Sequence, residues 1–388
     1  MDSACSLSSL LPEYRVLLAC ARTTLRPEQA AELRRLVSQP LDWAFLLQAG
    51  RQHFILPLLY RHLNTVCPEQ APAEVLAELQ HFLRAIAPRN LLLTDRLLRL
   101  VTLLEDHAIP VLPYKGPALA MQIYGDLSLR LYGDLDLLIR QRDFPRARTL
   151  LVQEGLAPVE PLQNDREAVA YAKWLHEYHL ALPDQDVQLE LQWKVIPLPA
   201  AFPPDDLDWW RQLPTLHLGG RQLPALPPET LLLILCAHGA KHLWARLSWL
   251  CDVAELIRSQ PTLDLARTNA QARRLGMERM FLFSLALARD LLEVALPDEL
   301  ADRIRTDRVV ARYVRLSREM FLLGGRREGD LPAEMLPRLP ILHLAMLDRL
   351  PDRLRACRLH YRRAFNPLLV LQTYGTSSFR YLREVLTG

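Results

Sequence analysis

The run Tyr132-Gly133-Asp134-Leu135-Asp136-Leu137-Leu138-Ile139 decides the fold of this 388-residue chain. Successive side chains of a strand point to opposite faces, so Asp134 and Asp136 are predicted to share one face while the leucines between them pack on the other. Two carboxylates this close repel each other unless a cation lies between them. Magnesium, which takes a few carboxylates together with substrate phosphates, meets that need. A lone Asp-x-Asp is also typical of an Asp-rich turn that ends in a strand, so the flanking residues must decide.

A glycine turn lies upstream of this strand. Residues 108–113 form a short apolar run after a helical region and predict a first strand, which Gly116 ends. Pro117 suits the first turn of a helix over 117–124, because its missing N–H is not needed there. The aspartate strand is predicted over 133–139, and a helix is expected over 144–154, before Gly155.

A hairpin is predicted further along the chain. Residues 177–182 and 187–195 are strand-like and flank the turn residues 183–186. Glu190 falls on the polar face of the second strand. Antiparallel pairing of that strand beside the aspartate strand would bring Glu190 to the same rim as Asp134 and Asp136.

Helical regions flank this core. Apolar residues recur at spacings of three and four over 10–107, and the chain is again helix-like from 229 onward. A proline-rich passage over 197–228 joins the core to the last region and holds a short predicted helix at 205–211. The predicted fold class is α+β, a small mixed β-sheet between N-terminal and C-terminal helical regions. The predicted domains are 1–107, 108–228 and 229–388.

Composition indicates a soluble globular protein. Half of the residues are hydrophobic and 23% are charged, which is ordinary for such proteins. The six cysteines form no C-x-x-C pair, and neither a secretion signal nor an apolar run long enough for a bilayer is evident. We therefore expect a reduced, cytoplasmic protein that does not enter a membrane.

Basic residues are distributed unevenly. Residues 301–388 contain 17 arginines against 9 acidic residues, so this part could meet a phosphate-rich or acidic partner, or its arginines could pair along helix surfaces. The whole chain has 43 arginines and only four lysines. A lysine retained in such a chain is a candidate for a compact point charge, which directs attention to Lys115 and Lys241.

Three separated motifs carry a family resemblance. They are Lys115-Gly116 with Tyr124-Gly125-Asp126, Arg130 and Gly133-Asp134-x-Asp136; Glu190-Leu191-Gln192-Trp193; and His238-Gly239-Ala240-Lys241-His242-x-Trp244-x-Arg246-Leu247-x-Trp249-Leu250-x-Asp252. Over about residues 40–290 the chain resembles the uncharacterised nucleotidyltransferase family of the DNA polymerase β-like superfamily. The resemblance implies a carboxylate triad of Asp134, Asp136 and Glu190 that binds divalent metal and is catalytic. It also implies a glycine-containing turn near the phosphates, at Lys115 and Gly116.

Further nucleotide contacts are expected from Arg130 and from the helix after Pro228. Lys241 and Arg246 are candidates for phosphate contacts. His238 and His242 lie four apart on one face of that helix, so they could be buried structural residues, a polar wall against nucleotide or acceptor, or metal ligands without an H-E-x-x-H motif. A metal site at His176 and His179 is rejected, because strand alternation puts them on opposite faces.

Two positions depart from the family pattern. Pro117 removes a backbone donor from the phosphate turn, and Gln192 replaces the usual histidine with a group that does not titrate. The predicted function is Mg²⁺- or Mn²⁺-dependent transfer of a nucleoside monophosphate from an NTP to an acceptor hydroxyl. The resemblance favours a modified peptide as acceptor, and a small molecule, a protein side chain or an RNA 3′ end stays open, although no RNA-binding signature argues for RNA. The alternatives are a catalytically weak nucleotide- or peptide-binding module and a toxin-like enzyme that modifies tRNA.

Overall fold

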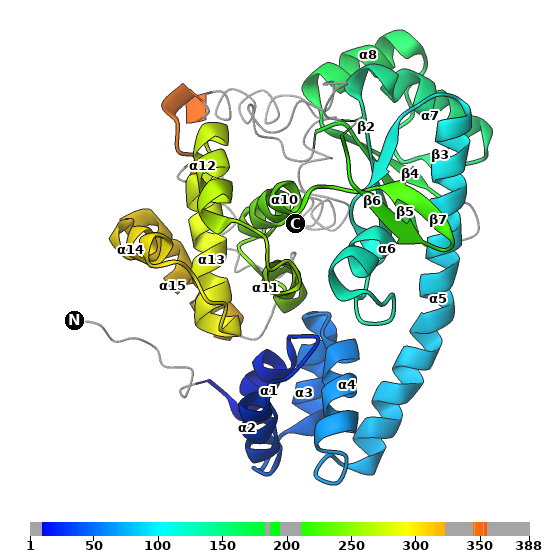
Figure 1. Ribbon diagram of the computed structural model, residues 1–388. Helices are drawn as coiled ribbons and strands as arrows, with labels where there is room; N and C mark the ends of the chain where they lie inside the picture. The colour runs from blue at the N-terminus through cyan, green and yellow to red at the C-terminus, as the bar shows by residue number, and fades with distance from the viewer. Residues whose placement is uncertain are drawn as a thin grey trace, which may run out of the picture.

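The computed structural model describes residues 10–182, 187–194, 210, 212–322, 344, 346–351, 353 and 354. Figure 1 shows helices of the N-terminal region at the bottom, a β-sheet at the upper right and the C-terminal helices on the left. The fold is α+β, with a small mixed sheet flanked by helices, as the sequence predicts.

Five helices precede the sheet, in agreement with the helical pattern of residues 10–107. They are α1 (Pro12–Cys20), α2 (Pro27–Val37), α3 (Trp43–Gln52), α4 (Leu56–Val66) and α5 (Ala73–Asp106). Prolines begin α1 and α2, where their missing N–H groups cost no helical bond. The long α5 runs along one side of the molecule, from the N-terminal helices up to the sheet (Figure 1).

The sheet contains five strands. They are β1 (Val111–Pro113), β2 (Asp134–Ile139), β3 (Ala157–Pro158), β4 (Glu177–Ala181) and β5 (Gln188–Gln192), in the spatial order β1-β2-β5-β4-β3. The predicted hairpin of β4 and β5 is confirmed as antiparallel. The predicted antiparallel pairing of β5 with β2 is wrong, because these two strands are parallel. The chain makes a long crossover between them before β5 enters the sheet in the direction of β2.

The crossover and the glycine turn contain short helices. They are α6 (Gly116–Leu119), the π-helical turn η2 (Ala120–Tyr124), the 3₁₀ turn η3 (Gln141–Asp143), α7 (Phe144–Gln153) and α8 (Asp165–Trp174). The expected helices at 117–124 and 144–154 are therefore present. The sequence prediction missed α8, which Asn164 caps by accepting a hydrogen bond from the Glu167 N–H at 3.0 Å.

A second, two-stranded sheet lies within the proline-rich passage. Strands β6 (Thr215–Leu218) and β7 (Arg221–Pro224) pair antiparallel across Gly219 and Gly220, both of which have positive φ. The density of prolines concealed this hairpin from the sequence prediction. Of the short helix predicted at 205–211, only Trp210 is among the described residues.

Six helices are described after Pro227, and the first begins at Pro228 as predicted. They are α10 (Pro228–Lys241), α11 (Leu247–Ser259), α12 (Leu265–Leu275), α13 (Glu278–Leu292), α14 (Asp298–Thr306) and α15 (Arg308–Leu322). Among the helices that the structure describes, none has the length and apolar character needed to cross a membrane.

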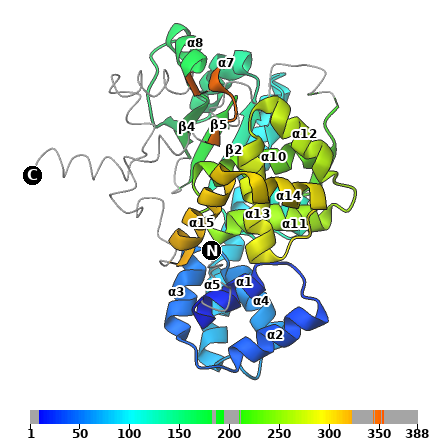
Figure 2. The ribbon, with the colours of Figure 1, turned by 90° about the vertical axis from the view of Figure 1, so that its left-hand side faces the viewer.

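Two hydrophobic cores organise the molecule. One core joins α1–α4 with α10–α13, although these helices are far apart in sequence, and Figure 2 shows the two groups stacked on each other. The other core lies between the sheet, α7 and the second half of α5. Leu135 and Leu137 face this second core, so the aspartates between and beside them face the other way, toward the helical core. The domain boundaries after residues 107 and 228 remain a prediction.

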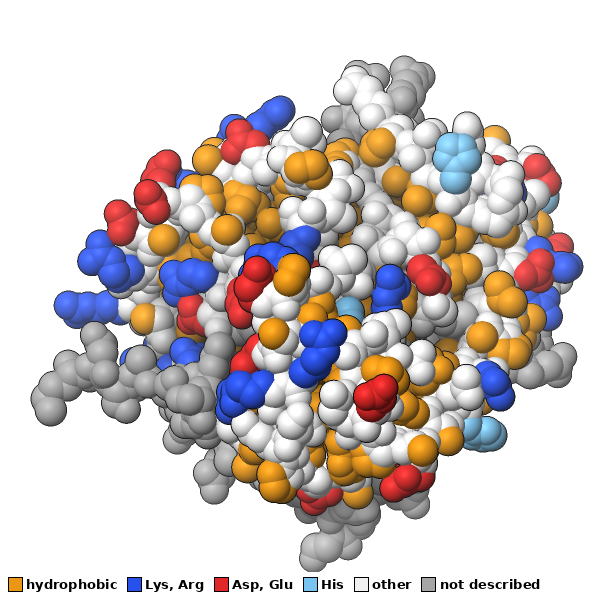
Figure 3. All heavy atoms as spheres, turned by 60° about the horizontal axis from the view of Figure 1, so that its bottom comes forward, with side chains coloured by type: hydrophobic (Ala, Val, Ile, Leu, Met, Phe, Trp, Pro, Cys, Tyr) orange, Lys and Arg blue, Asp and Glu red, His pale blue; other side chains and the backbone are white. Residues whose placement is uncertain are grey.

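Several arginines of the C-terminal third pair with carboxylates. Arg303 contacts Glu278 at 2.6 Å, and Arg318 contacts Asp290 at 3.8 Å. On the face shown in Figure 3, positive and negative side chains are interspersed among apolar ones. For the described part of this region, these pairs favour the interpretation that its arginines interact with neighbouring helices.

Candidate active site

The three predicted carboxylates share one face of the sheet. In the parallel register of β2 and β5, Asp136 lies directly opposite Glu190, and Asp134 lies two residues before Asp136. Asp136 is buried, whereas Asp134 and Glu190 are half-buried. The structure thus brings the triad positions together, through parallel pairing and not through the antiparallel pairing that was expected.

Lys115 neutralises the most buried of these carboxylates. It lies between β1 and α6, and its Nζ contacts Asp136 Oδ1 at 2.7 Å. Burial raises the pKa of Asp136 well above its usual range, Lys115 opposes this, and the neighbouring Glu190 adds to it. An ionised Asp136 therefore depends on a cation, and Lys115 supplies one.

Gly116 brings the turn close to β2. Its φ is +54°, and a Cβ added there would lie 3.3 Å from the carbonyl oxygen of Asp134. A side chain at this position would combine backbone strain with a tight contact against the aspartate strand. Pro117 follows in the first turn of α6, so it offers no backbone donor beside the glycine.

Gln192 bridges two of the carboxylates. Its Nε2 donates to Asp136 Oδ1 at 3.1 Å and to Glu190 Oε2 at 2.8 Å. The hydroxyl of buried Tyr114 donates to Oε1 of the same amide. Because Tyr114 fixes the oxygen end of the amide, the nitrogen end faces the carboxylates. Position 192 therefore holds the acidic pair together through neutral hydrogen bonds.

One carboxylate oxygen at this site lacks a partner. Asp136 Oδ2 is buried and accepts no hydrogen bond from the part of the chain that the structure describes. Within that same part, no three His, Cys, Asp or Glu side chains are grouped closely enough to hold a metal ion by themselves. The donor atoms here are all carboxylate oxygens, which suit a hard cation such as Mg²⁺ that takes few protein ligands and completes its shell with phosphate or water.

A second acidic group lies along the same face, on β4. His179 is the register partner of Glu190, and both His176 and His179 approach Glu177 Oε1, at 3.3 and 3.6 Å between Nε2 and Oε1. Although burial raises it, the two imidazoles and Lys241 hold the pKa of Glu177 well below its usual range. The expectation that the histidines diverge is wrong, because His176 precedes the strand and is not bound by its alternation.

The end of α10 approaches this face of the sheet. Lys241 is exposed and acts electrostatically on Glu177, and His238 and His242 are half-buried with ring centroids 4.8 Å apart. Burial, followed by the positive charge of Lys115, lowers the pKa of His238 well below its usual range. Gly239 is required here, because a Cβ would lie 2.3 Å from the ring of Trp244.

Arg130 contacts a carboxylate of α11. Its Nε lies 3.0 Å from Asp252 Oδ1 and its Nη2 lies 3.0 Å from Oδ2, and the hydroxyl of Tyr124 donates to Oδ1 at 2.8 Å. Asp252 is buried, and 11% of the Arg130 side chain is exposed. This fork-to-carboxylate pair fixes the segment before Asp134 against the C-terminal helices. The nucleotide contact expected of Arg130 stays a prediction.

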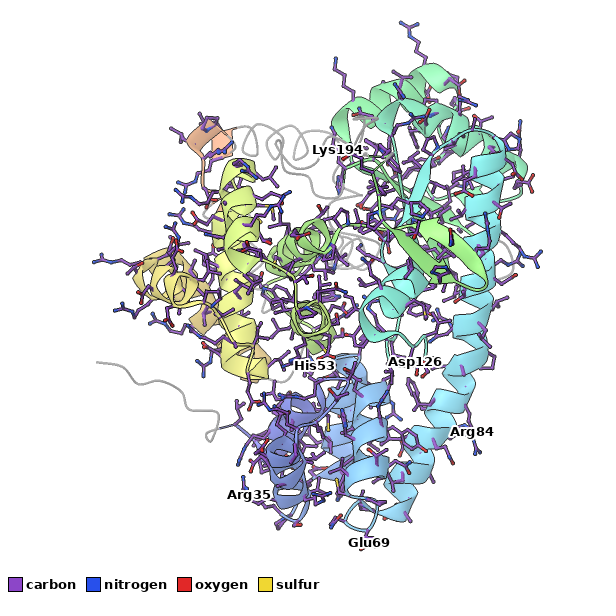
Figure 4. All side chains as sticks on the ribbon, in the orientation of Figure 1. Arg35, His53, Glu69, Arg84, Asp126 and Lys194 are labelled. Carbon is purple, nitrogen blue, oxygen red and sulfur yellow. The ribbon has the colours of Figure 1, made fainter. Side chains whose placement is uncertain are left out.

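Arg246 lies between two aromatic rings. Its guanidinium carbon is 4.5 Å from the ring centroid of Phe54 and 5.1 Å from that of Trp249. Beside it, His53 Nδ1 accepts a hydrogen bond from the N–H of Leu247 at 3.2 Å, which caps α11. Figure 4 shows His53 where the N-terminal helices meet α11. Sequence reasoning missed His53 and Phe54, because only tertiary contact connects them to this helix.

The sequence also matches a known protein family. The sequence profile of the uncharacterised nucleotidyltransferase family matches residues 39–293, which is more than half of the chain. The protein belongs to this family. Membership supports nucleotidyl transfer as the general activity and identifies neither metal, nucleotide nor acceptor. No curated protein and no solved structure matches the chain significantly.

Proposed function

We propose that this protein transfers a nucleoside monophosphate from an NTP to an acceptor hydroxyl, with release of pyrophosphate. One observation carries the proposal: Asp136 presents a buried, unpartnered Oδ2 on the sheet face that also bears Asp134 and Glu190. A buried carboxylate oxygen without a donor is costly, and a bound cation would remove that cost. Three acidic side chains on one face are hard to explain by stability alone.

Asp134, Asp136 and Glu190 are the residues that would hold Mg²⁺ or Mn²⁺. When bound, the metal would neutralise charge on the reacting phosphate and on the leaving pyrophosphate. Because no three carboxylates of the described residues are grouped closely enough to hold a metal ion by themselves, the triphosphate is expected to complete the coordination. A carboxylate of the group is expected to accept the proton of the acceptor hydroxyl.

The basic side chains around the carboxylates would bind the triphosphate. We assign phosphate contacts to Lys115, which would exchange Asp136 for a phosphate oxygen, and to the N–H of Gly116. Lys241, His242 and Arg246 lie on the facing helical region and are proposed to contact the same nucleotide. Arg130 is already paired with Asp252, so we assign it to holding the segment before Asp134.

A peptide or small molecule is the proposed acceptor class. A second candidate function is a catalytically weak module that holds a nucleotide or peptide. The Lys115–Asp136 ion pair favours it, since it neutralises the central carboxylate without metal. Pro117 favours it too, because it takes a donor from the phosphate turn.

Transfer of label distinguishes these functions. The protein would be incubated with each NTP, labelled at the α- or at the γ-phosphate, together with Mg²⁺ and cell extract. Nucleotidyl transfer requires label from the α-phosphate to appear in an acceptor fraction, and none from the γ-phosphate. Asp134→Asn should abolish the signal, and Asp126→Asn, at an exposed aspartate of the preceding loop, is the matched control. Label from the γ-phosphate, or none from either, would contradict the proposal.

A further inference from the structure

Of the three rings that cluster beside the carboxylates, only His242 has a role in the proposed function. His238, His242 and Trp249, here called the ring cluster, have centroids 4.8–5.1 Å apart in tilted or edge-to-face arrangements. Each of the three side chains is half-buried. A cluster that only fills a core is enclosed, as Phe144 and Trp193 are on the other side of the sheet, where both are fully buried. The ring cluster therefore offers aromatic surface to a ligand.

The ring cluster is fixed relative to the aspartate strand. Trp249 lies one helical turn before Asp252 on α11, so the two residues lie on the same side of that helix. Asp252 binds Arg130, and Arg130 precedes Asp134 by four residues. A short, buried connection thus joins the ring cluster to the carboxylates.

A cation also contacts Trp249. The Arg246 guanidinium lies over both Trp249 and Phe54, and Phe54 has a φ of +59°, which is uncommon for a residue other than glycine. A backbone held in a sparsely populated region is a frequent property of functional sites. The N-terminal helices therefore supply a part of the wall that holds the indole in place.

The charge of His238 suits a planar, uncharged ligand group. Burial and the neighbouring Lys115 lower the pKa of His238, so that its imidazole is neutral near pH 7. Neutral imidazole and indole rings stack on any nucleobase, since every base has a π-face.

We propose that the nucleobase of the NTP stacks on the ring cluster while the phosphates of the NTP bind at the carboxylate face. This inference rests on the proposed function. Stacking on these rings tolerates more than one base, because every base has a π-face. Selection between bases by this cluster is accordingly expected to be weak.

Calorimetry with two kinds of ligand tests the inference. Each of the four Mg²⁺·NTPs and Mg²⁺·tripolyphosphate, which has the phosphates but no base, would be titrated into wild type, Trp249→Leu, Trp249→Phe and Trp43→Leu. Trp43 is a half-buried tryptophan at the far end of α3 from His53, and it serves as the matched control. Trp249→Leu should weaken NTP binding by about tenfold or more and leave tripolyphosphate unchanged. Trp249→Phe should retain most of the NTP affinity.

Other outcomes distinguish failure of the stacking site from failure of the proposed function. Wild type that binds NTPs no better than tripolyphosphate, or Trp249→Leu that weakens both equally, overturns the stacking site and leaves the triphosphate site standing. Wild type that binds neither ligand overturns the proposed function as well. If Trp249→Leu does not fold, His238→Ala, which changes a ring with no assigned phosphate contact, is titrated in its place with the same criteria.

Discussion

Asp136 and Glu190 lie opposite each other on two parallel strands, and the Gln192 amide donates to both, at 3.1 and 2.8 Å. Two carboxylates are thus held side by side by one neutral side chain, which Tyr114 orients from behind. This arrangement keeps the acidic pair assembled before any ligand arrives. The free energy lost to repulsion between these two carboxylates, and their dependence on a cation, can be measured.

Gln192→Leu should destabilise the protein. The change leaves the Tyr114 hydroxyl and two carboxylate oxygens without this partner in a buried place, which costs about 2–3 kcal/mol of unfolding free energy. Urea unfolding measures it. Gln188→Leu, at an exposed position facing the same side of β5, should change stability by less than about 0.5 kcal/mol. Equal effects of the two changes would mean that the bridge does not hold the site together.

Lys115→Met should be strongly destabilising at neutral pH. It removes the cation on which an ionised Asp136 depends, so this carboxyl, whose side chain is 0% exposed, must bind a proton or stay as an uncompensated buried charge, with an expected cost of about 3–5 kcal/mol. The double variant Lys115→Met/Asp136→Asn should recover most of that loss, because the charge is then removed as well. A double-mutant cycle from chemical denaturation gives the coupling. If the two changes had additive effects on the free energy of unfolding, the ion pair would not stabilise the fold.

Asp252→Asn should loosen the segment before β2. The buried carboxylate receives three donors from Arg130 and Tyr124, and an amide cannot match the bidentate pair. Hydrogen exchange should become faster at residues 125–133, while α7 on the far side of the sheet keeps its protection. Arg130→Lys should have a similar effect, since an ammonium does not reproduce the fork. Unchanged exchange over this segment would show that other contacts suffice to hold it.

His53 should make stability depend on pH. Burial, and then the charge of Arg246, lowers its pKa from 6.5 to about 4 in the folded state, where Nδ1 accepts the Leu247 N–H. A lowered pKa means that its contribution is complete above pH 6.5 and is lost as the pH falls toward 4, by about 1.4 kcal/mol per pH unit. Melting temperatures across this range should fall less steeply for His53→Asn than for wild type. His81→Asn, at an exposed histidine, should leave the slope unchanged.

Local pattern was sufficient for much of the fold. The alternation around Asp134 and Asp136 predicted their common face, and the turn residues 183–186 predicted the hairpin of β4 and β5. The direction of β5 beside β2 was not predictable in this way, because it depends on a crossover of some fifty residues and not on either strand. Strands β6 and β7 were missed because prolines at their ends resemble a linker.

The site was predictable only in part, for a related reason. Strand alternation placed Asp134 and Asp136 on one face, whereas the catalytic roles of these residues and Glu190, and the phosphate role of Lys115, came with the family resemblance and stay predictions. The pairing of Arg130 with Asp252 joins residues 122 positions apart, and His53 reaches Leu247 across 194 positions. The hydrophobic periodicity of the sequence does not predict such contacts, since they arise from how distant helices pack.

Calorimetry and thermal melting with a non-hydrolysable NTP analogue test the central claim most directly, which is that the carboxylate face binds a metal shared with the triphosphate. Mg²⁺ and the analogue together should raise the melting temperature of wild type, whereas either one alone should have little effect. Asp136→Asn should remove the joint effect, even if its own melting temperature without metal equals that of wild type. Tight analogue binding in EDTA, or an undiminished joint effect in Asp136→Asn, would contradict the claim and favour a binding module without metal chemistry.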